Sequence, residues 1–242
     1  MTSLIQLLSK AHHLGAAWRR RGSNHWPVLP LPTLSVGNVA FGGRCKTPLV
    51  IDIVREAQSR GLRPGVLSRG YGRRGGRRAA PAAVPSRTRP SEHAAWLTEV
   101  GRQANLLGDE PALIAATTGC AVGVHADRVR AAETLLAVDE VDLFVLDDGF
   151  QTPVQRQLDI VSLDLMRDPP FAYLDATREG AGSLKRASLA ALILPPEMAP
   201  SGVSRSNQHL AGLPEGLDAM PIRRRGGRLL ALKSGLEIDD KI

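Results

Sequence analysis

A run of glycine, lysine and threonine residues has the composition of a phosphate-binding loop. Gly42-Gly43-Arg44-Cys45-Lys46-Thr47 follows an apolar segment and precedes an amphipathic one. In such a loop, backbone N–H groups and the next helix N-terminus face phosphate, the Lys contacts the β and γ oxygens, and the Thr hydroxyl binds Mg²⁺. The full pattern G-x-x-x-x-G-K-T fails at Ala40 and Cys45, and a Cβ at position 45 would approach the phosphate. The alternative is an ordinary turn with an exposed Lys46.

Two acids at the end of an apolar segment form a second candidate group. Val141–Leu146 is predicted to be a buried strand, and Asp147 and Asp148 follow it. Nucleotide enzymes hold Mg²⁺ with acids delivered in this way, although an Asp there can also cap the next turn. The two candidates support each other, because a phosphate loop needs a metal-binding acid. We therefore expect Lys46 and the two acids to meet at one triphosphate–magnesium site.

Gly108-Asp109-Glu110-Pro111 is a third candidate with two interpretations. Asp109 could be the N-cap of a helix, or a carboxylate that accepts the hydroxyl proton of an acceptor alcohol during phosphoryl transfer. The residues themselves leave both open. The six histidines lack metal-ligand spacing and no Ser lies in G-x-S-x-G, so nothing supports a zinc or serine hydrolase.

Alternating strands and helices are expected to position these groups. Continuous apolar strands between amphipathic helices predict an α/β fold, in which a mostly parallel sheet carries helices on both faces. Ligands of such sheets bind at the carboxyl ends of the strands. The predicted strands are 34–39, 65–68, 121–125, 141–146, 158–163 and 189–194, and the predicted helices are 48–60, 109–118 and 128–137, the last capped by Asp127.

Three segments fall outside this pattern. Residues 3–18, which Arg19 to Arg21 follow, are predicted to form an amphipathic helix that either lies in a membrane interface or packs on its own domain. It is too interrupted to span a membrane and lacks the features of a signal peptide. Residues 69–90, rich in Arg, Gly and Pro, are predicted to be a loop or mobile lid, and residues 195–228 to be poorly ordered.

Composition narrows the class of protein without deciding the partner. The chain has 242 residues and is 43% hydrophobic, which argues against disorder, and its two cysteines argue against a disulfide framework. No apolar run reaches the about 18 residues of a membrane-spanning helix, which argues against a polytopic membrane protein. Its net charge of +7 suits nucleic acid, an anionic membrane or a phosphorylated substrate. Aromatic residues make up only 4%, which weakens an interpretation based on stacking of single-stranded bases.

Taken together, the ordered motifs resemble the tetraacyldisaccharide 4′-kinases of lipid A synthesis. The resemblance covers about residues 1–195. Its motifs are Val36-Gly37-Asn38, the Gly42 to Pro48 loop, Leu62 to Gly72, Gly108-Asp109-Glu110-Pro111, Asp127-Arg128-Val129 and Asp147-Asp148-Gly149-Phe150-Gln151.

The resemblance implies a P-loop NTPase-like kinase that uses ATP and Mg²⁺. Such a kinase moves the γ-phosphate of ATP to the 4′-hydroxyl of a tetraacylated glucosamine disaccharide 1-phosphate. It works as a peripheral protein at the cytoplasmic face of the inner membrane, with the lipid surface as a partner and no nucleic acid expected. The implied parts are an N-terminal helix at 1–27, a kinase core at 28–195 and a remnant of a second lobe at 196–242; the oligomeric state stays open.

The resemblance also implies roles for individual residues. Lys46 would neutralise phosphate charge, Thr47, Asp147 and Asp148 would bind Mg²⁺, and Asp109 would be the general base with Glu110 beside it. The nucleotide loop would comprise Ala40, Phe41, Gly42, Gly43, Arg44, Cys45, Lys46 and Thr47. Substrate contacts would come from Arg69, Tyr71, Arg73, Arg74, Arg128 and Gln151, and the Arg-rich segment that also includes Arg77 and Arg78 would meet the 1-phosphate or anionic lipid.

Several positions depart from the family pattern. The family has Gly where this chain has Cys45 and His where it has Thr152, and its Ala-Gly-Pro-Leu-Arg segment appears as Ala181 to Lys185. Arg228 to Gly235 resembles the opening strand of the second lobe, which supplies a late His, and the sequence ends at Ile242. We therefore expect either a truncated member or a diverged relative that binds nucleotide or membrane with reduced or lost catalysis.

Overall fold

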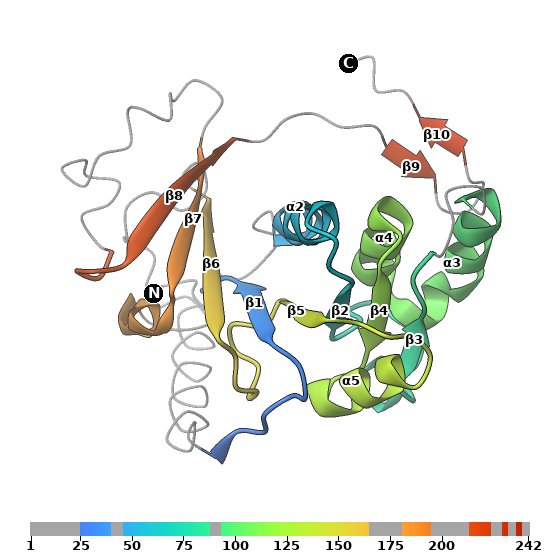
Figure 1. The fold of residues 1–242 in the computed structure, drawn as a ribbon, viewed down its shortest axis with the longest axis horizontal. Helices are drawn as coiled ribbons and strands as arrows, with labels where there is room; N and C mark the ends of the chain where they lie inside the picture. Colours follow the sequence, from blue (N-terminus) through green and yellow to red (C-terminus); the bar gives the residue numbers. More distant parts are fainter. Residues whose placement is uncertain are drawn as a thin grey trace, which may run out of the picture. The chain divides into compact units, whose positions relative to one another are not determined.

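The computed structural model describes residues 25–39, 46–87, 93–164, 181–194, 213–223, 229–231 and 236–238. These residues form two compact units (Figure 1). Those of unit 1 fall within 1–28, 34–46 and 148–224, and those of unit 2 within 29–33, 47–147 and 225–242. The expected N-terminal helix and residues 40–45 of the expected phosphate loop lie outside the described residues.

Unit 1 is built on parallel strands. Their order is β1 (Thr33–Gly37), β6 (Leu158–Asp164), β7 (Leu189–Leu194) and β8 (Asp218–Arg223). The register of the first pair sets Leu34 opposite Leu158 and Gly37 opposite Val161. β6 and β7 are buried along almost their whole length, which is why their sequences are continuous apolar runs.

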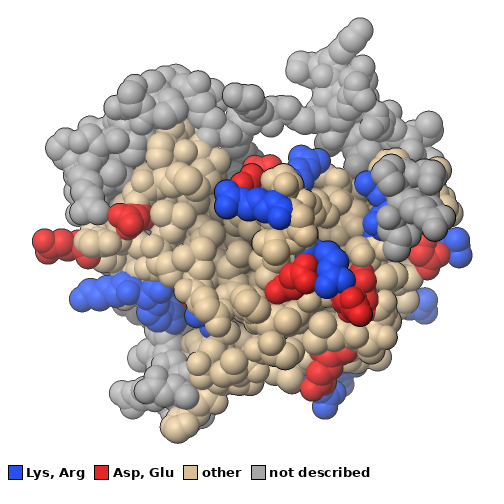
Figure 2. Space-filling view, in the orientation of Figure 1, with Lys and Arg blue, Asp and Glu red and all other residues tan. Residues whose placement is uncertain are grey.

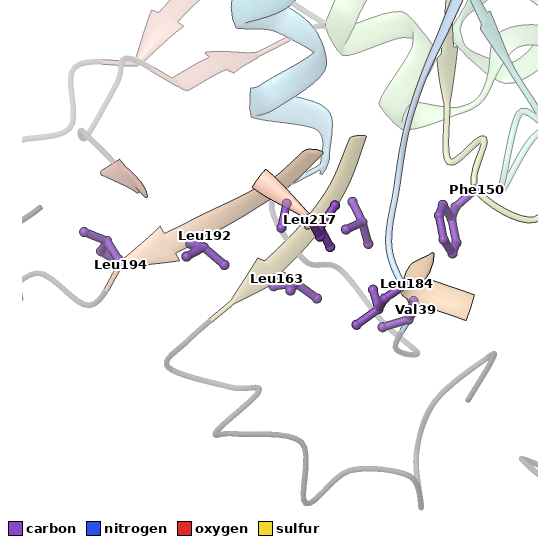
Figure 3. Close-up of a cluster of buried hydrophobic side chains, with 9 residues drawn as sticks. Val39, Phe150, Leu163, Leu184, Leu192, Leu194 and Leu217 are labelled. Atoms are coloured by element: carbon purple, nitrogen blue, oxygen red, sulfur yellow. The ribbon is translucent and has the colours of Figure 1, made fainter. Parts of the chain in front are cut away.

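A buried hydrophobic cluster holds unit 1 together on one face of these strands (Figure 3). Alternate residues contribute from each strand, Leu192 and Leu194 from β7 and Leu163 from β6, because side chains two apart point to the same face. Leu184 of the short helix η4 (Ala181–Arg186) and Phe150 pack against them. Full burial of one such side chain stabilises the fold by about 1.5–3 kcal/mol.

Unit 2 has the layered arrangement expected of an α/β protein. Its strand order is β3 (Ala82–Val84), β4 (Ala121–Val124), β2 (Pro64–Ser68) and β5 (Leu143–Asp147), and all pairs but β3–β4 are parallel. Figure 1 shows α2 (Lys46–Ser59) and α4 (Asp109–Thr118) on one face of these strands and α5 (Arg128–Leu136) on the other. The unit also contains α3 (His93–Leu107) and an antiparallel pair, β9 (Leu229–Ala231) and β10 (Leu236–Ile238).

Two local features explain how α5 is placed. The Asp127 side chain accepts a hydrogen bond of 2.9 Å from the N–H of Val129, so the predicted N-cap is confirmed. A Cβ on Gly123 would lie 2.6 Å from the carbonyl oxygen of Ala131. Glycine in β4 therefore lets the helix approach the sheet more closely than any other residue would allow.

The predicted α/β class with mostly parallel strands is confirmed, and the element predictions hold with shifted ends. β7 has the predicted bounds, whereas β5 begins two residues later and extends to Asp147. α3 had no counterpart among the predictions. None of the described helices has the length and apolar character that a bilayer crossing requires.

Three predictions are corrected by the structure. Asp109 is the first residue of α4, and the N-cap is Gly108. Residues 69–90 are not simply a lid, because β3 joins the sheet and a short helix, η2 (Gly76–Arg78), precedes it. Within 195–228, β8 is an ordered strand that pairs in parallel with β7, and its Pro221 is tolerated because β8 lies at the edge.

Candidate functional site

In unit 1, the Lys46 ammonium and the Asp148 carboxylate form an ion pair. Nζ lies 3.3 Å from Oδ1, and the two side chains are 9% and 26% exposed. Lys46 is the first residue of α2, where the positive end of the helix dipole also favours anions. Lys46 is therefore not the exposed lysine of the alternative interpretation, whereas the turn at 40–45 lies outside the described residues.

The turn after β5 is tied to the end of β1, and this places Asp148 beside Lys46. The N–H of Gly149 donates to the carbonyl of Val36 at 3.0 Å, and Gln151 Nε2 donates to the carbonyl of Asn38 at 2.8 Å. A Cβ on Gly37 would lie 2.5 Å from the Cβ of Phe150, so only glycine lets the turn cross the strand. The motif Val36-Gly37-Asn38 is thus in direct contact with Gly149-Phe150-Gln151.

Asp148 has an unusual backbone conformation. Its φ is 52°, the only positive value at a non-glycine position among the residues that the structure describes. A left-handed conformation costs an L-residue about 1–2 kcal/mol, and Asp tolerates it better than most. Such strain is concentrated at functional sites, where surrounding contacts maintain it.

In unit 2, Asp147 is buried among the carboxyl ends of three strands. Its Oδ2 accepts a hydrogen bond of 3.0 Å from Ser68 Oγ at the end of β2, and 1% of the residue is exposed. The N–H of His125, which follows β4, donates to the Ser68 carbonyl at 3.1 Å. Ser68 was not predicted as a site residue. Its position at the carboxyl end of an apolar strand, where ligands of parallel sheets bind, was the sequence signal that could have identified it.

Asp109 lies beside another glycine-rich segment of unit 2. A Cβ on Gly108, whose φ is 92°, would lie 2.5 Å from the Tyr71 carbonyl, so the segment passes directly over the start of α4. A Cβ on Gly72 would lie 3.9 Å from Asp109 Oδ2. Asp109 and Glu110 are exposed in the first turn of α4, and across the described residues the Asp109 carboxylate has no hydrogen-bond or ion-pair partner.

Two predicted substrate contacts are structural instead. Arg73 is 5% exposed and donates hydrogen bonds to the carbonyls of Val124 and Ala80, and burial lowers the pKa of its guanidinium. Arg128 is 2% exposed and donates to the carbonyls of His125 and Asp147 at 2.8 and 3.3 Å. Both guanidinium groups are buried and donate to internal carbonyls, so neither is exposed for a substrate contact, which corrects these two predictions.

The remaining predicted contacts differ in exposure. Tyr71 is 83% exposed, and Arg69, Arg74 and Arg78 are exposed as well. Gln151 is half-buried, and its side chain donates a hydrogen bond to the carbonyl of Asn38, the residue after β1. On the face shown in Figure 2, basic and acidic side chains of the described residues lie close to one another and do not form one continuous basic patch.

The oxygen donors near the ion pair suit magnesium. Mg²⁺ takes oxygen ligands and usually keeps several waters and substrate phosphate oxygens, so it needs only one or two carboxylates from the protein. In unit 1, the partly exposed Asp148 carboxylate beside Lys46 is an oxygen donor of this kind. In the described part of the chain, no three His, Cys, Asp or Glu side chains gather into a metal cluster.

Comparison with known proteins identifies one family. The family model "Tetraacyldisaccharide-1-P 4'-kinase" (LpxK) matches residues 1–172. A tetraacyldisaccharide 4′-kinase of Ectopseudomonas mendocina is 41% identical over 139 residues, which are 57% of this chain and 37% of that protein. One of Bordetella parapertussis is 35% identical over 227 residues, covering 82% of this chain and 58% of that protein. This chain thus spans roughly 40 to 60% of the lengths of these relatives.

A solved structure shares the fold. The "apo" form of LpxK from Aquifex aeolicus, in complex with ATP, aligns with a TM-score of 0.66 and 23% sequence identity. The alignment covers 88% of this chain and 62% of that one.

Proposed function

The chain belongs to the tetraacyldisaccharide 4′-kinase family, and from this premise we propose that it transfers the γ-phosphate of ATP to the 4′-hydroxyl of a tetraacyldisaccharide 1-phosphate. The observation that carries the proposal is the partly buried ion pair of 3.3 Å between Lys46 and Asp148. It joins the segment of the predicted phosphate loop to the predicted metal-binding acids, two motifs that are far apart in the sequence. An ATP complex of a protein with this fold supports the nucleotide.

In this proposal each polar group has one task. Lys46 exchanges Asp148 for phosphate oxygens and neutralises their charge, and Thr47, Asp147 and Asp148 hold Mg²⁺. Bound Mg²⁺ supplies further charge neutralisation at the β and γ phosphates. Ser68 fixes the orientation of the Asp147 carboxylate through its hydrogen bond. Asp109 accepts the proton of the acceptor hydroxyl, with Glu110 beside it.

The acceptor is an acylated glucosamine disaccharide phosphate, which resides in a membrane. We accordingly propose a peripheral position at the cytoplasmic face of the inner membrane, with the amphipathic residues 3–18 and the exposed basic side chains of 69–78 toward the lipid surface. The second candidate function is a relative that binds nucleotide or membrane and has impaired catalysis. Cys45 in the phosphate loop and the buried Thr152 in place of a histidine favour it.

Transfer of radiolabelled γ-phosphate to the lipid acceptor in detergent micelles tests the proposal. We expect the wild-type chain to label the lipid, and Asp109→Ala to lose about 10²- to 10⁴-fold in rate while retaining ATP binding. Asp52→Ala, an exposed acid of α2, is the matched control and should behave as wild type. ATP binding without transfer by the wild-type chain would support the impaired relative, and equal rates for Asp109→Ala and wild type would refute the role of the base.

A further inference from the structure

The guanidinium group of Arg156 lies inside the loop that follows the acid pair. Nη1 donates to the carbonyls of Thr152 and Val154 at 2.7 and 3.1 Å, and Nη2 donates to the carbonyl of Phe150 at 2.9 Å. Nε and Nη2 both donate to Asp159 Oδ2, at 2.9 and 2.6 Å. These five contacts match the five N–H donors of a guanidinium group, so the donors of Arg156 are fully used.

The carbonyls that Arg156 binds belong to the segment that determines where Asp148 lies. Phe150 is two residues after Asp148 and packs over Gly37 of β1. The N–H of Thr152 donates to the Gly149 carbonyl at 2.8 Å, which closes a turn directly after the acid. Any movement of the carbonyls at 150 or 152 is therefore passed to Asp148, whose backbone already has a φ of 52°.

Arg156 is itself anchored to the sheet. Asp159 belongs to β6, which pairs with β1, and the two side chains are 7% and 9% exposed. Burial raises the pKa of the Asp159 carboxyl, and the charge and hydrogen bonds of Arg156 oppose that rise. The Trp26 ring covers the guanidinium at 5.7 Å, and Gln155 Nε2 donates to the Trp26 carbonyl at 2.9 Å. The Arg156 guanidinium is thus held by Asp159 of β6 and covered by the ring of Trp26.

We propose that Arg156 is a positioning residue for Asp148: its guanidinium fixes the loop after the acid pair, and thereby the orientation in which the Asp148 carboxylate meets Mg²⁺. This inference rests on the function proposed above, since Asp148 holds a metal only if the chain binds Mg·ATP. Arginine is required because its planar fork reaches three carbonyls and a carboxylate at once, whereas the three donors of a lysine ammonium cannot.

Calorimetric titration of ATP at increasing MgCl₂ concentrations, and in EDTA, tests the inference on Arg156→Lys. Arg63→Lys is the matched control, because Arg63 also binds a carboxylate, Asp142 at 2.8 Å, but lies in unit 2 at an exposed position. We expect Arg156→Lys to raise the Mg²⁺ concentration for half-maximal binding by about 10- to 100-fold, the usual effect of losing a group that orients a metal ligand. ATP affinity in EDTA should not change, and Arg63→Lys should change neither quantity.

The outcomes separate a positioning role from a structural one. A folded Arg156→Lys variant with a lowered melting temperature but a wild-type Mg²⁺ dependence would overturn the inference. If Arg156→Lys does not fold, Asp159→Asn decides instead, and we expect a several-fold shift of the Mg²⁺ dependence in the same direction; a wild-type dependence there would overturn it equally. Absence of Mg·ATP binding by the wild-type chain would refute the proposed function itself, before any variant is compared.

Discussion

Replacing Gly37 with alanine should displace the turn that carries Asp148. The new Cβ would lie 2.5 Å from the Cβ of Phe150 and 2.6 Å from its backbone N, whereas ordinary contact begins at 3.4 Å. The difference, 3.4 − 2.5 = 0.9 Å, must be absorbed by the turn. A shift of this size directed along the line from Lys46 to Asp148 would lengthen their separation from 3.3 Å to at most about 4.2 Å, beyond the reach of a direct ion pair. Overpacking of this kind costs about 1–3 kcal/mol of unfolding free energy.

Urea unfolding and the phosphate-transfer assay measure the two consequences of Gly37→Ala. A misplacement near 1 Å can lower a catalysed rate by about 10²-fold, so we expect the rate to fall more than the stability loss explains. Gly182→Ala is the matched control, because nothing lies within 4 Å of a Cβ at that position and the substitution has the same effect on the unfolded chain. Wild-type stability and rate in Gly37→Ala would show that the turn does not depend on this contact, and would refute the reasoning.

Three further results are expected. Cys45→Gly should raise ATP affinity, because it removes a Cβ from the phosphate loop; unchanged or weaker binding by calorimetry would contradict that loop geometry. Cys120 should resist thiol reagents at pH 8 in the folded chain and react in urea, since burial raises its pKa to about 12; peptide mapping that finds it labelled in the folded chain would contradict its burial. Arg63 lowers the pKa of Asp142 through a hydrogen bond, so this acid stabilises the fold above its ordinary pKa and loses the effect as pH falls through the lowered value. Asp142→Asn should accordingly reduce the acid-induced loss of stability in unfolding experiments from pH 7 to pH 2, and an unaltered pH profile would contradict the interaction.

Strong local signals explain which parts of the fold were predictable. Buried parallel strands require continuous apolar runs, so β7 was predicted with its observed bounds. The Asp127 cap was predictable because a carboxylate directly before an amphipathic helix commonly accepts a hydrogen bond from a backbone N–H of the first turn. The contact between Lys46 and Asp148 was expected from chemistry alone, since a phosphate loop and a metal-binding acid need each other.

Long-range contacts explain what the sequence did not reveal. Arg73 and Arg128 were expected to contact the substrate, because their charge says nothing of the internal carbonyls to which they donate. The Pro, Gly and Ser content of residues 195–228 suggested poor order, yet β8 accepts Pro221 because the strand needs no donor on its open edge. Helix α3 carried a recognisable signal in the spacing of its buried residues Trp96, Leu97, Val100 and Leu107. The sequence around Arg156 contains no comparable signal, because its hydrogen bonds to the carbonyls of Phe150, Thr152 and Val154 form only when the loop folds around it.

Calorimetric binding of ATP to Lys46→Ala and Asp148→Asn, with and without Mg²⁺, tests the central claim most directly. We expect Lys46→Ala to lose about 10- to 100-fold in affinity under both conditions, as a charged hydrogen bond to phosphate is removed. Asp148→Asn should lose affinity only when Mg²⁺ is present, and Lys185→Ala, an exposed lysine of the same unit, should match the wild-type chain. Wild-type affinity in both site variants, with and without Mg²⁺, would contradict the claim that Lys46 and Asp148 form a nucleotide–magnesium site.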